Sequence, residues 1–449
     1  MNKRRKVTQL PRDPGVAAWR ALLPNPHDFN PLEKDLVVDW AIVGAGFAGL
    51  SAARRLHQLL GSSERIALLE ATDFAAGPCG RNSGFMLDLP HELNSNSYAG
   101  ALEADRQQIA YNRHAIDFAA GVAAERSVDA GVFARSGKMT AAATAVGEQH
   151  LVQYAAHLKA LNEPFEWRSA QTLQDLTGSH YYRRGLFTPG AAMIQPAAYL
   201  HALADTLQPR VEVFCNTPVI TLHHGDLYTL QTPRGQVRAR QVILAVNGHI
   251  QSFGFFPQRL MHVFTYASMT HALSASQLER LGGEANWGIL PADPMGTTVR
   301  KVDDPLRGGA RIVVRNEVTL NQSLAVGPRQ MQRAARRQEH SFKARFPELA
   351  DVAMAYRWGG RLCLSLNSAP AFGELAPRLW SACCQNGLGT VKGSMAGIAV
   401  AEMATAQPSA LSKAFAAASG PSQLPPRPLL SLGANGVMKW KQWRAGAEV

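Results

Sequence analysis

The sequence predicts an α/β protein with more than one domain, and two observations lead to this prediction. Near the start, an apolar run at residues 37–43 leads into a glycine-rich turn and then a helix-like segment, which is the order of a strand–helix–strand unit. Further along, short strand-like stretches between 211 and 240 and longer ones between 259 and 315 follow a region of helical periodicity. With 449 residues, 46% of them hydrophobic, the chain is long enough for two or three domains.

The glycine-rich turn has the spacing of a dinucleotide-binding site. Gly44 permits a tight turn after the strand, Gly46 lets the backbone approach a pyrophosphate, and Gly49 lets the next helix pack closely on the strand. A second strand at 66–69 ends in Glu70, at about the distance from the turn expected of a carboxylate that binds a ribose hydroxyl. The helix start would offer free N–H groups to phosphates. A glycine-rich turn in another α/β protein is the alternative, and the motif alone does not choose between NAD and FAD.

A loop and several helices follow this unit. Residues 72–85 form a loop rich in glycine and small residues, and its position after the second strand suits a second approach to the nucleotide. The spacing of apolar residues predicts helices at about 99–129, 147–161, 171–177 and 196–207. Residues 1–35 are predicted to be a polar arm broken by prolines, with one short helix at 17–23.

Strand-like segments dominate the rest of the chain. A meander of short strands at 211–214, 219–222, 227–230 and 237–240 leads to an apolar strand at 241–248, typical of a strand buried on both faces. Beyond it we expect strands at 259–269, 297–302, 310–315 and 379–382, and helices at 329–346 and 393–406. From Pro421 the tail is rich in proline and is predicted to be irregular.

Charge and cysteine content limit the classes of function. The net charge of +12 is concentrated at 3–6, 329–345 and 439–444, which suits a solvated basic surface or contact with an anionic lipid or an acidic protein. No nucleic-acid partner is expected, because no helix-turn-helix, zinc-finger or RNP pattern accompanies the charge. No apolar run is long enough to cross a membrane, and no secretory signal follows the basic start. The five cysteines lack metal-like spacing, so we expect reduced thiols, a cytoplasmic location and no metal site.

Four motifs, in this order, resemble the FAD-dependent oxidoreductases of the D-amino-acid oxidase, glycine oxidase and sarcosine oxidase family, and most of all its gamma-glutamylputrescine oxidase-like branch. The first three are the fingerprint with Glu70, the Gly-Arg-Asn-Ser-Gly loop at 80–84, and the strand at 242–248 that ends in Asn-Gly. The fourth combines the Trp-Gly-Gly at 358–360 with residues 370–373 and 386–389. The matches run from about 17 to 406, and the last three motifs favour FAD over NAD.

The resemblance implies a Rossmann-like FAD-binding domain of the GR2 type and an α+β substrate domain built on a bent, largely antiparallel sheet. The FAD-binding domain would combine residues 36–95, 185–255 and 350–410. The substrate domain would combine residues 96–184 and 256–349. An N-terminal arm, 1–35, and a C-terminal tail, 411–449, would flank them.

The resemblance also implies roles for individual residues. The three glycines of the fingerprint would hold the pyrophosphate, and Glu70 would hold the adenosine ribose. The 81–83 loop would approach the pyrophosphate and the isoalloxazine, the backbone of Val219 would meet adenine, and 387–389 would direct N–H groups at the flavin pyrimidine. The full cofactor-binding set is Gly44, Gly46, Phe47, Ala48, Gly49, Glu70, Arg81, Asn82, Ser83, Val219, Ala245, Asn247, Gly248, Gly360, Asn386, Gly387, Leu388, Gly389 and Thr390.

The chemistry implied by the resemblance is oxidation of a C–N bond in an amine or an amino acid. Hydride would pass to flavin N5, the imine would hydrolyse in water, and O2 would be reduced to H2O2. We name no catalytic base, because members of this family often lack an obligatory one. The candidate substrate contacts are His262, Tyr266, Arg315 and Arg361, of which Arg361 suits bidentate binding of a carboxylate. A surface or structural role is the alternative for each.

One departure from the family pattern concerns the electron acceptor. Sarcosine-oxidase-like members carry a lysine near flavin N5 that helps O2 react, but the strand at 308–316 has two arginines and no lysine, and Lys301 and Lys392 are weak substitutes. A dehydrogenase of the same fold, passing electrons to a quinone or a protein, is therefore an alternative. It would dock to a membrane or an acidic partner through the basic ends, with Trp440 and Trp443 as anchors. A non-catalytic flavoprotein subunit is a third alternative.

A second departure concerns how FAD is held. Some members of the family bind FAD covalently through a cysteine or a histidine. Cys363 lies near the position of such a cysteinyl link, but the residues after it do not match. We therefore expect non-covalent FAD, with a link through Cys363 as the lesser alternative, and the sequence does not indicate an oligomeric state.

Overall fold

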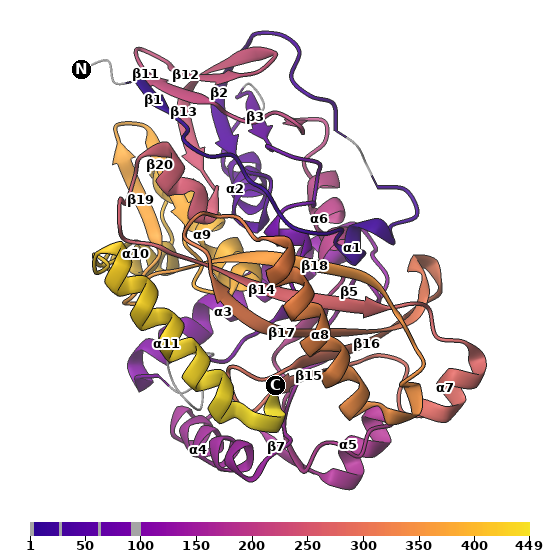
Figure 1. Ribbon diagram of the computed structural model, residues 1–449. Coiled ribbons are helices and arrows are strands. Elements are labelled where there is room, and N and C mark those ends of the chain that lie inside the picture. Colours follow the sequence, from indigo (N-terminus) through magenta and orange to yellow (C-terminus); the bar gives the residue numbers. More distant parts are fainter. Residues whose placement is uncertain (1–3, 27–28, 62–63, 91–99) are drawn as a thin grey trace.

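The fold is built on two large sheets with helices packed around them (Figure 1). A computed structural model of the chain describes residues 4–26, 29–61, 64–90 and 100–449. Lys3 of the basic start and residue 99 of a predicted helix lie outside the described residues, as do parts of the 36–95 segment.

The first sheet has nine strands, and its centre is parallel. The central strand β2 (Leu36–Val43) pairs in parallel with β3 (Ile66–Leu69) on one side and with β13 (Gly235–Leu244) on the other. The other members are β1 (Arg4–Lys6), β10 (Val211–Phe214), β11 (Thr221–His224), β12 (Tyr228–Thr232), β19 (Ala371–Ala376) and β20 (Leu379–Cys383). Strand β3 and residues 40–43 of β2 are continuous apolar runs because they are buried on both faces.

Two helices pack closely against each other over this sheet. They are α2 (Phe47–Leu59), which follows β2, and α9 (Gly389–Ala404). A Cβ at Gly397 of α9 would lie 2.2 Å from the carbonyl oxygen of Ala48, so only glycine permits this approach. The pairing brings the N-terminal ends of both helices toward the same edge of the sheet (Figure 1).

The second sheet has eight strands and is antiparallel apart from one pair. Its order is β18 (Met354–Leu364), β14 (Met261–Thr270), β17 (Gly309–Leu320), β16 (Thr298–Asp304), β15 (Trp287–Pro291), β6 (Lys138–Ala142), β8 (Arg184–Thr188) and β7 (Glu166–Ser169). Only β15 and β6 pair in parallel among the described strands of this sheet. A small third sheet joins β4 (Phe85–Met86), β9 (Ala192–Ile194) and β5 (Phe133–Ala134).

The remaining helices lie around the two sheets. They are α1 (Ala18–Ala21), α3 (Leu102–Glu125), α4 (Ala145–Leu161), α5 (Ala170–Thr177), α6 (Pro196–Asp205), α7 (Ala275–Leu281), α8 (Pro328–Arg345), α10 (Ala410–Ala416) and α11 (Arg427–Ala445). Local sequence sets several of their ends: the Thr144 hydroxyl caps α4 by accepting from Gly147 N at 2.9 Å, and Pro196 and Pro328 occupy first turns. Across the described residues, every helix is too short or too polar to span a bilayer.

The prediction of an irregular C-terminal tail is wrong, because residues 427–445 form the helix α11. Its inward face carries Leu430 and Ala445, which are buried. Gly433 and Gly436 weakened the helical signal in the sequence, and packing against β17 overrides their low helix propensity. Residues expected to be irregular are therefore helical and packed against the second sheet.

The N-terminal arm is also part of the folded body. Strand β1 pairs with β11 at one edge of the first sheet, and Gly15 forms a bridge with Trp358 of the second sheet. Gly15 has φ +73°, and a Cβ there would lie 2.1 Å from the carbonyl oxygen of Arg357. The arm therefore runs from one sheet to the other.

Three strands depart from the expected division and topology. Strand β8, expected almost wholly within the 185–255 segment of the FAD-binding domain, pairs with β6 and β7 in the second sheet. Strand β10 leaves the predicted meander and pairs in parallel with β3, so the meander is reduced to the antiparallel hairpins of β11, β12 and β13. Strand β18, expected within the 350–410 segment of the FAD-binding domain, pairs with β14 in the second sheet. The alternating pattern of a short strand does not specify which sheet it joins, because that depends on long-range packing.

Candidate cofactor and substrate site

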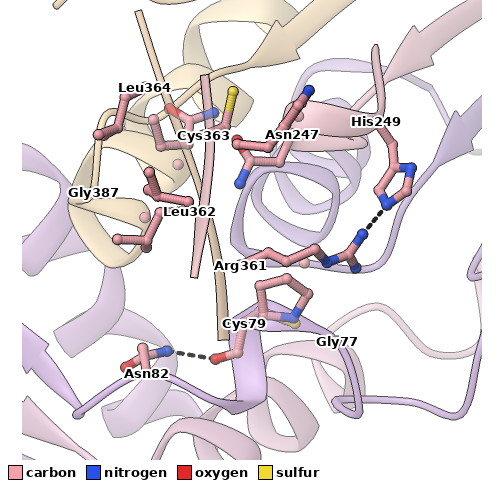
Figure 2. Close-up of a pocket in the computed structure, with 18 of the residues that line it drawn as sticks. Gly77, Cys79, Asn82, Asn247, His249, Arg361, Leu362, Cys363, Leu364 and Gly387 are labelled. Carbon is pink, nitrogen blue, oxygen red and sulfur yellow. Dashed lines mark hydrogen bonds between the residues drawn. The ribbon is translucent and has the colours of Figure 1, made fainter. Parts of the chain in front are cut away.

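A cavity of about 510 Å³ lies between the two sheets, at the carboxyl ends of β2, β3 and β13. Ligands bind at this edge of open α/β sheets, and the volume lies within the usual range of ligand pockets. Figure 2 shows part of the wall, where residues 361–364 of β18 face Asn247 and the 77–82 loop. The cavity therefore joins the predicted nucleotide loop to the second sheet.

The glycine-rich turn has the geometry that its sequence predicts. Gly44 has φ +103°, and a Cβ at Gly49 would lie 1.8 Å from the Gly44 carbonyl oxygen, so α2 rests directly on the turn. A Cβ at Gly46 would find its nearest atom, Cys79 Cβ, at 3.7 Å, so space opens beside Gly46. Phe47 and Ala48, at the start of α2, line the cavity. The positive end of the helix dipole therefore faces a space suited to a pyrophosphate.

Glu70 lies at the end of β3 with its carboxylate fixed by the backbone. One oxygen accepts a hydrogen bond from Ala45 N at 3.0 Å, and the other accepts from the backbone N and the hydroxyl of Thr72, each at 3.2 Å. Burial raises the pKa of Glu70, and these hydrogen bonds oppose that shift. The side chain lines the cavity, so its remaining lone pairs can accept hydrogen bonds from ribose hydroxyls.

Two buried amide oxygens in the cavity wall indicate that a ligand belongs there. Asn247 Oδ1 and Gln385 Oε1 are buried and have no hydrogen-bond partner among the described residues. Leaving such an oxygen unsatisfied costs about 1–3 kcal/mol, which is why buried polar groups usually have partners. Both residues line the cavity, so a bound heterocycle with N–H donors would satisfy them.

The start of α9 supplies a further part of the same wall. Gly387 has φ +85°, and Gly387, Leu388, Gly389 and Thr390 all line the cavity. The helix then runs 16 residues with its N-terminal end at the cavity. A negative charge that develops on a bound ring beside this end would be stabilised by the unpaired N–H groups and the dipole.

Arg361 and Asp13 form a buried ion pair beside the cavity. Nε and Nη2 of Arg361 donate to the two oxygens of Asp13, each at 2.9 Å, and Nη1 contacts Nε2 of His249 (Figure 2). Burial, and then the charge of Arg361, lowers the pKa of His249 to about 2, so this ring is neutral and accepts the hydrogen bond. The bidentate carboxylate site expected at Arg361 is therefore already filled by the N-terminal arm.

Of the other three candidate substrate contacts, two line the cavity and one does not. His262 and Arg315 line the cavity, and His262 Nε2 lies 2.8 Å from Gln251 Oε1. Tyr266 does not reach the cavity: its hydroxyl lies 2.6 Å from Thr319 Oγ1, and its ring packs under α8. Side chains alternate across a strand, so Val263 and Thr265 face the cavity where Tyr266 faces away.

Four residues of the predicted cofactor set also lie outside the cavity wall. Gly49 packs on the turn, and Gly360 packs against Arg81. The Arg81 guanidinium turns away to the carbonyl oxygens of Ala76, Pro14 and Gly359. Asn386 bridges loops, since its Oδ1 accepts from Ser365 N at 2.8 Å. These residues shape the site without facing it, whereas the following predicted residues line it: Gly44, Gly46, Phe47, Ala48, Glu70, Asn82, Ser83, Val219, Ala245, Asn247, Gly248, Gly387, Leu388, Gly389 and Thr390.

Several stretches of the wall were not foreseen from the sequence, and one of them, at 290–298, comes from β15 and the start of β16. Residues 9–11 of the arm line the cavity, and so do Ala434, Val437, Met438 and Lys441 of α11. The spacing of 434, 438 and 441 is helical and offered a signal, but the surrounding glycines obscured it. The arm offered no signal, because its place depends on a partner more than 300 residues away.

The lysine and cysteine candidates are also located. Lys301 donates to the Glu284 carbonyl oxygen at 2.9 Å, and neither Lys301 nor Lys392 lines the cavity, so the lysine in the described wall is Lys441. Cys363 lines the cavity, and contact with the Cys384 thiol, together with burial, raises its pKa. None of the five cysteines, all of which lie in the described ranges, forms a disulfide. A protonated Cys363 thiol favours non-covalent FAD, since the thiolate is the reactive form.

The fold and the site together define a flavin-type dinucleotide oxidoreductase. The chain belongs to the FAD dependent oxidoreductase family, which it matches over residues 39–403, and FAD is its cofactor. It is 24% identical to the probable oxidoreductase OrdL of Haemophilus influenzae over 83% of this chain and 84% of that protein. It is 22% identical to the gamma-glutamylputrescine oxidoreductase of Escherichia coli over 84% and 85% of the two chains.

Solved structures show the same fold. The glycine oxidase of Geobacillus kaustophilus superposes with a TM-score of 0.67 at 16% identity, covering 84% of this chain and 96% of that one. The L-amino acid deaminase of Proteus vulgaris superposes with a TM-score of 0.64 at 13% identity, covering 88% and 99%. The predicted family and fold class, a Rossmann-like FAD-binding domain with a second α+β domain, are therefore confirmed.

Proposed function

We propose that this oxidoreductase oxidises the C–N bond of an amine that carries a carboxylate, such as an amino acid or an N-substituted amino acid. The observation that carries the proposal is that one continuous cavity joins the cofactor wall at Gly44, Glu70 and Gly387 to a second wall with His262 and Arg315. A substrate held on the second wall faces the cofactor directly. Bound FAD supplies the hydride-accepting centre, and the protein supplies position and charge.

The charges of the second wall support a substrate with an anionic group. Arg315 and Lys441 are cations in this wall, and among the described lining residues Glu70, at the ribose end, is the only carboxylate. A polyamine without a carboxylate would meet like charge there, whereas a carboxylate would be attracted. The amine nitrogen would then point toward the cofactor. The α carbon would lose a hydride to the flavin and the nitrogen would lose a proton, which gives an imine that water hydrolyses.

O2 is the proposed electron acceptor, and a quinone or a protein acceptor is the second candidate. The family relationship and the glycine oxidase fold support an oxidase. Lys301 and Lys392 lie away from the cavity, so neither supplies the oxygen-activating lysine of sarcosine-oxidase-like members. This observation favours a quinone or a protein as the acceptor.

The test is anaerobic bleaching of the flavin by primary amines, N-methyl amines and amino acids of both hands, followed by aerobic peroxide assay. We expect bleaching by amines that carry a carboxylate and peroxide release on turnover. Arg315→Met and Lys441→Met should raise KM by about 10-fold or more with a smaller change in kcat, because they remove binding charge rather than chemistry. Lys159→Met, an exposed lysine on α4, is the matched control.

Three outcomes decide between the alternatives. Turnover only with an artificial acceptor would favour the dehydrogenase. Bleaching only by compounds without an amine would exclude C–N oxidation. A yellow protein that no substrate bleaches would support the non-catalytic flavoprotein.

A further inference from the structure

Helix α11 has two unlike faces. Ala434, Met438 and Lys441 point inward and line the cavity. Trp440 and Trp443, three residues apart on the other face, are 52% and 78% exposed, and Val437 at the rim is 54% exposed. Single exposed apolar residues are ordinary, but two adjacent exposed tryptophans on one helix face are a patch that calls for a partner.

Cations surround this patch. The Arg444 guanidinium lies 4.9 Å from the Trp440 ring centroid, and Lys439 is exposed beside it. Helix α8 lies alongside α11 over β17, and Arg337 of α8 donates to Gln442 of α11 at 3.4 Å (Figure 1). The exposed cations of α8 are Arg329, Arg333, Arg336 and Lys343.

Carboxylates are few on these two helices. Helix α11 contains none, and α8 contains one, Glu339, which pairs with Arg357. Glu317 of β17 pairs with Arg333 of α8. The positive charge of this face therefore rests mainly on Arg329, Arg336 and Lys343. The basic N-terminal residues Arg4 and Lys6 belong to β1 at the far edge of the first sheet, so they do not add to this face (Figure 1).

We propose that the outward face of α11, together with the exposed cations of α8, docks the protein on an anionic lipid surface. Tryptophan side chains sit preferentially at the level of lipid headgroups, and flanking lysines and arginines are attracted to anionic lipids. Two neighbouring tryptophans flanked by cations are the arrangement of an interfacial membrane anchor, and an acidic protein as the occupant would instead leave anionic vesicles unbound. The docking is peripheral, because no described helix is able to span a bilayer.

The docking has a consequence for the cavity. Because Val437 belongs to the exposed rim and also lines the cavity, docking through α11 brings the cavity rim to the lipid surface. A lipid-soluble electron acceptor would then approach the cavity from the bilayer. This consequence rests on the proposed function, whereas the docking itself does not.

The test is sedimentation of the full-length FAD-bound protein with vesicles of phosphatidylcholine alone or mixed with phosphatidylglycerol. We expect at least about 10-fold stronger binding to the anionic vesicles, weakened by salt. Trp440→Ser/Trp443→Ser should weaken binding about 10-fold, and Arg329→Ser/Arg336→Ser should remove the preference for anionic lipid. Arg4→Ser/Lys6→Ser is the charge-matched control and should bind as the wild type does.

Thermal unfolding and the flavin spectrum establish that each variant is folded, and neither readout depends on a substrate. Failure to sediment with anionic vesicles would overturn the proposal, as would equal binding by wild type and Trp440→Ser/Trp443→Ser. If a second copy of the chain covers the patch, light scattering should show an oligomer for the wild type and a monomer for Trp440→Ser/Trp443→Ser. That result would also overturn the proposal of lipid docking.

Discussion

At the scale of single residues, the site depends on side chains that hold other side chains. Arg361 was a candidate for binding a substrate carboxylate, yet it binds the carboxylate of Asp13 and contacts a neutral His249. The side chains of Asp13 and Arg361 are 6% and 7% exposed. A buried pair of this kind is costly to break because the remaining charge stays in a poorly solvating environment.

The Asp13→Ala variant tests this pair. Removing the carboxylate leaves Arg361 buried without its charge partner, which should destabilise the protein by about 3–5 kcal/mol. Residues 9–11, the part of the arm that lines the cavity, should also be held less firmly. The dissociation constant of FAD should therefore rise. Chemical denaturation and flavin fluorescence titration measure the two effects.

The double variant Asp13→Ala/Arg361→Met separates charge from packing. It removes both charges, so it should be more stable than Asp13→Ala alone. Equal losses in the single and double variants would mean that the pair contributes through shape and not through charge.

At the scale of elements, helix α11 is held by its C-terminal end. The Glu448 carboxylate accepts hydrogen bonds from Ala143 N at 2.8 Å and from the N and hydroxyl of Thr144, each at 2.9 Å. Arg345 donates to the Glu448 carbonyl oxygen at 3.0 Å. The segment after α11 is thus bonded to α4 and α8, and it fixes the helix that lines the cavity.

Glu448→Ala should release this end of α11. The two backbone N–H groups at 143 and 144 would lose their acceptor, at a cost of about 1–3 kcal/mol, and α11 should become accessible to trypsin at its lysines. Glu448→Gln keeps an acceptor oxygen and serves as the matched variant, with a smaller loss of stability. Proteolysis of both variants at the wild-type rate would contradict the anchoring role.

The elements that the sequence predicted best are those with strong local signals. The β2–turn–α2 unit follows from three glycines and a buried strand, and α4 and α8 lie within two residues of the predicted helices at 147–161 and 329–346. The place of β10, β18 and α11 depends on contacts with distant segments, which no local pattern encodes.

The candidate site also has a part that was predictable from the sequence and a part that was not. Backbone-based positions such as Gly44 and Gly387 were predictable because their positive φ angles, +103° and +85°, favour glycine. The orientation of side chains was not: Tyr266 turned to the opposite face of its strand, and Arg81 turned to three carbonyl oxygens. Residue type alone does not state which way a strand residue faces.

At the scale of the whole molecule, the cofactor cavity unites the two sheets. Walls from the first sheet, the second sheet, the arm and α11 enclose one space. A ligand in that space contacts all of them, so its binding energy opposes the separation of the sheets.

FAD should therefore stabilise the molecule as one unit. Free FAD at 100 times its dissociation constant should add about 2.7 kcal/mol to the free energy of unfolding of the apoprotein. Calorimetry should show a single transition that moves upward with FAD concentration. Two transitions, of which FAD shifts only one, would show that the sheets unfold independently.

The ion pair between Asp13 and Arg361 also sets an order of events during protein synthesis. The two residues are separated by 348 positions, and at about 5–20 residues per second the ribosome needs roughly 17–70 s to make the intervening chain. During that interval the arm has no partner at Arg361 and no Trp358 to bridge. The cofactor pocket is thus completed late in translation, and the emerging arm stays open to chaperones and proteases until then.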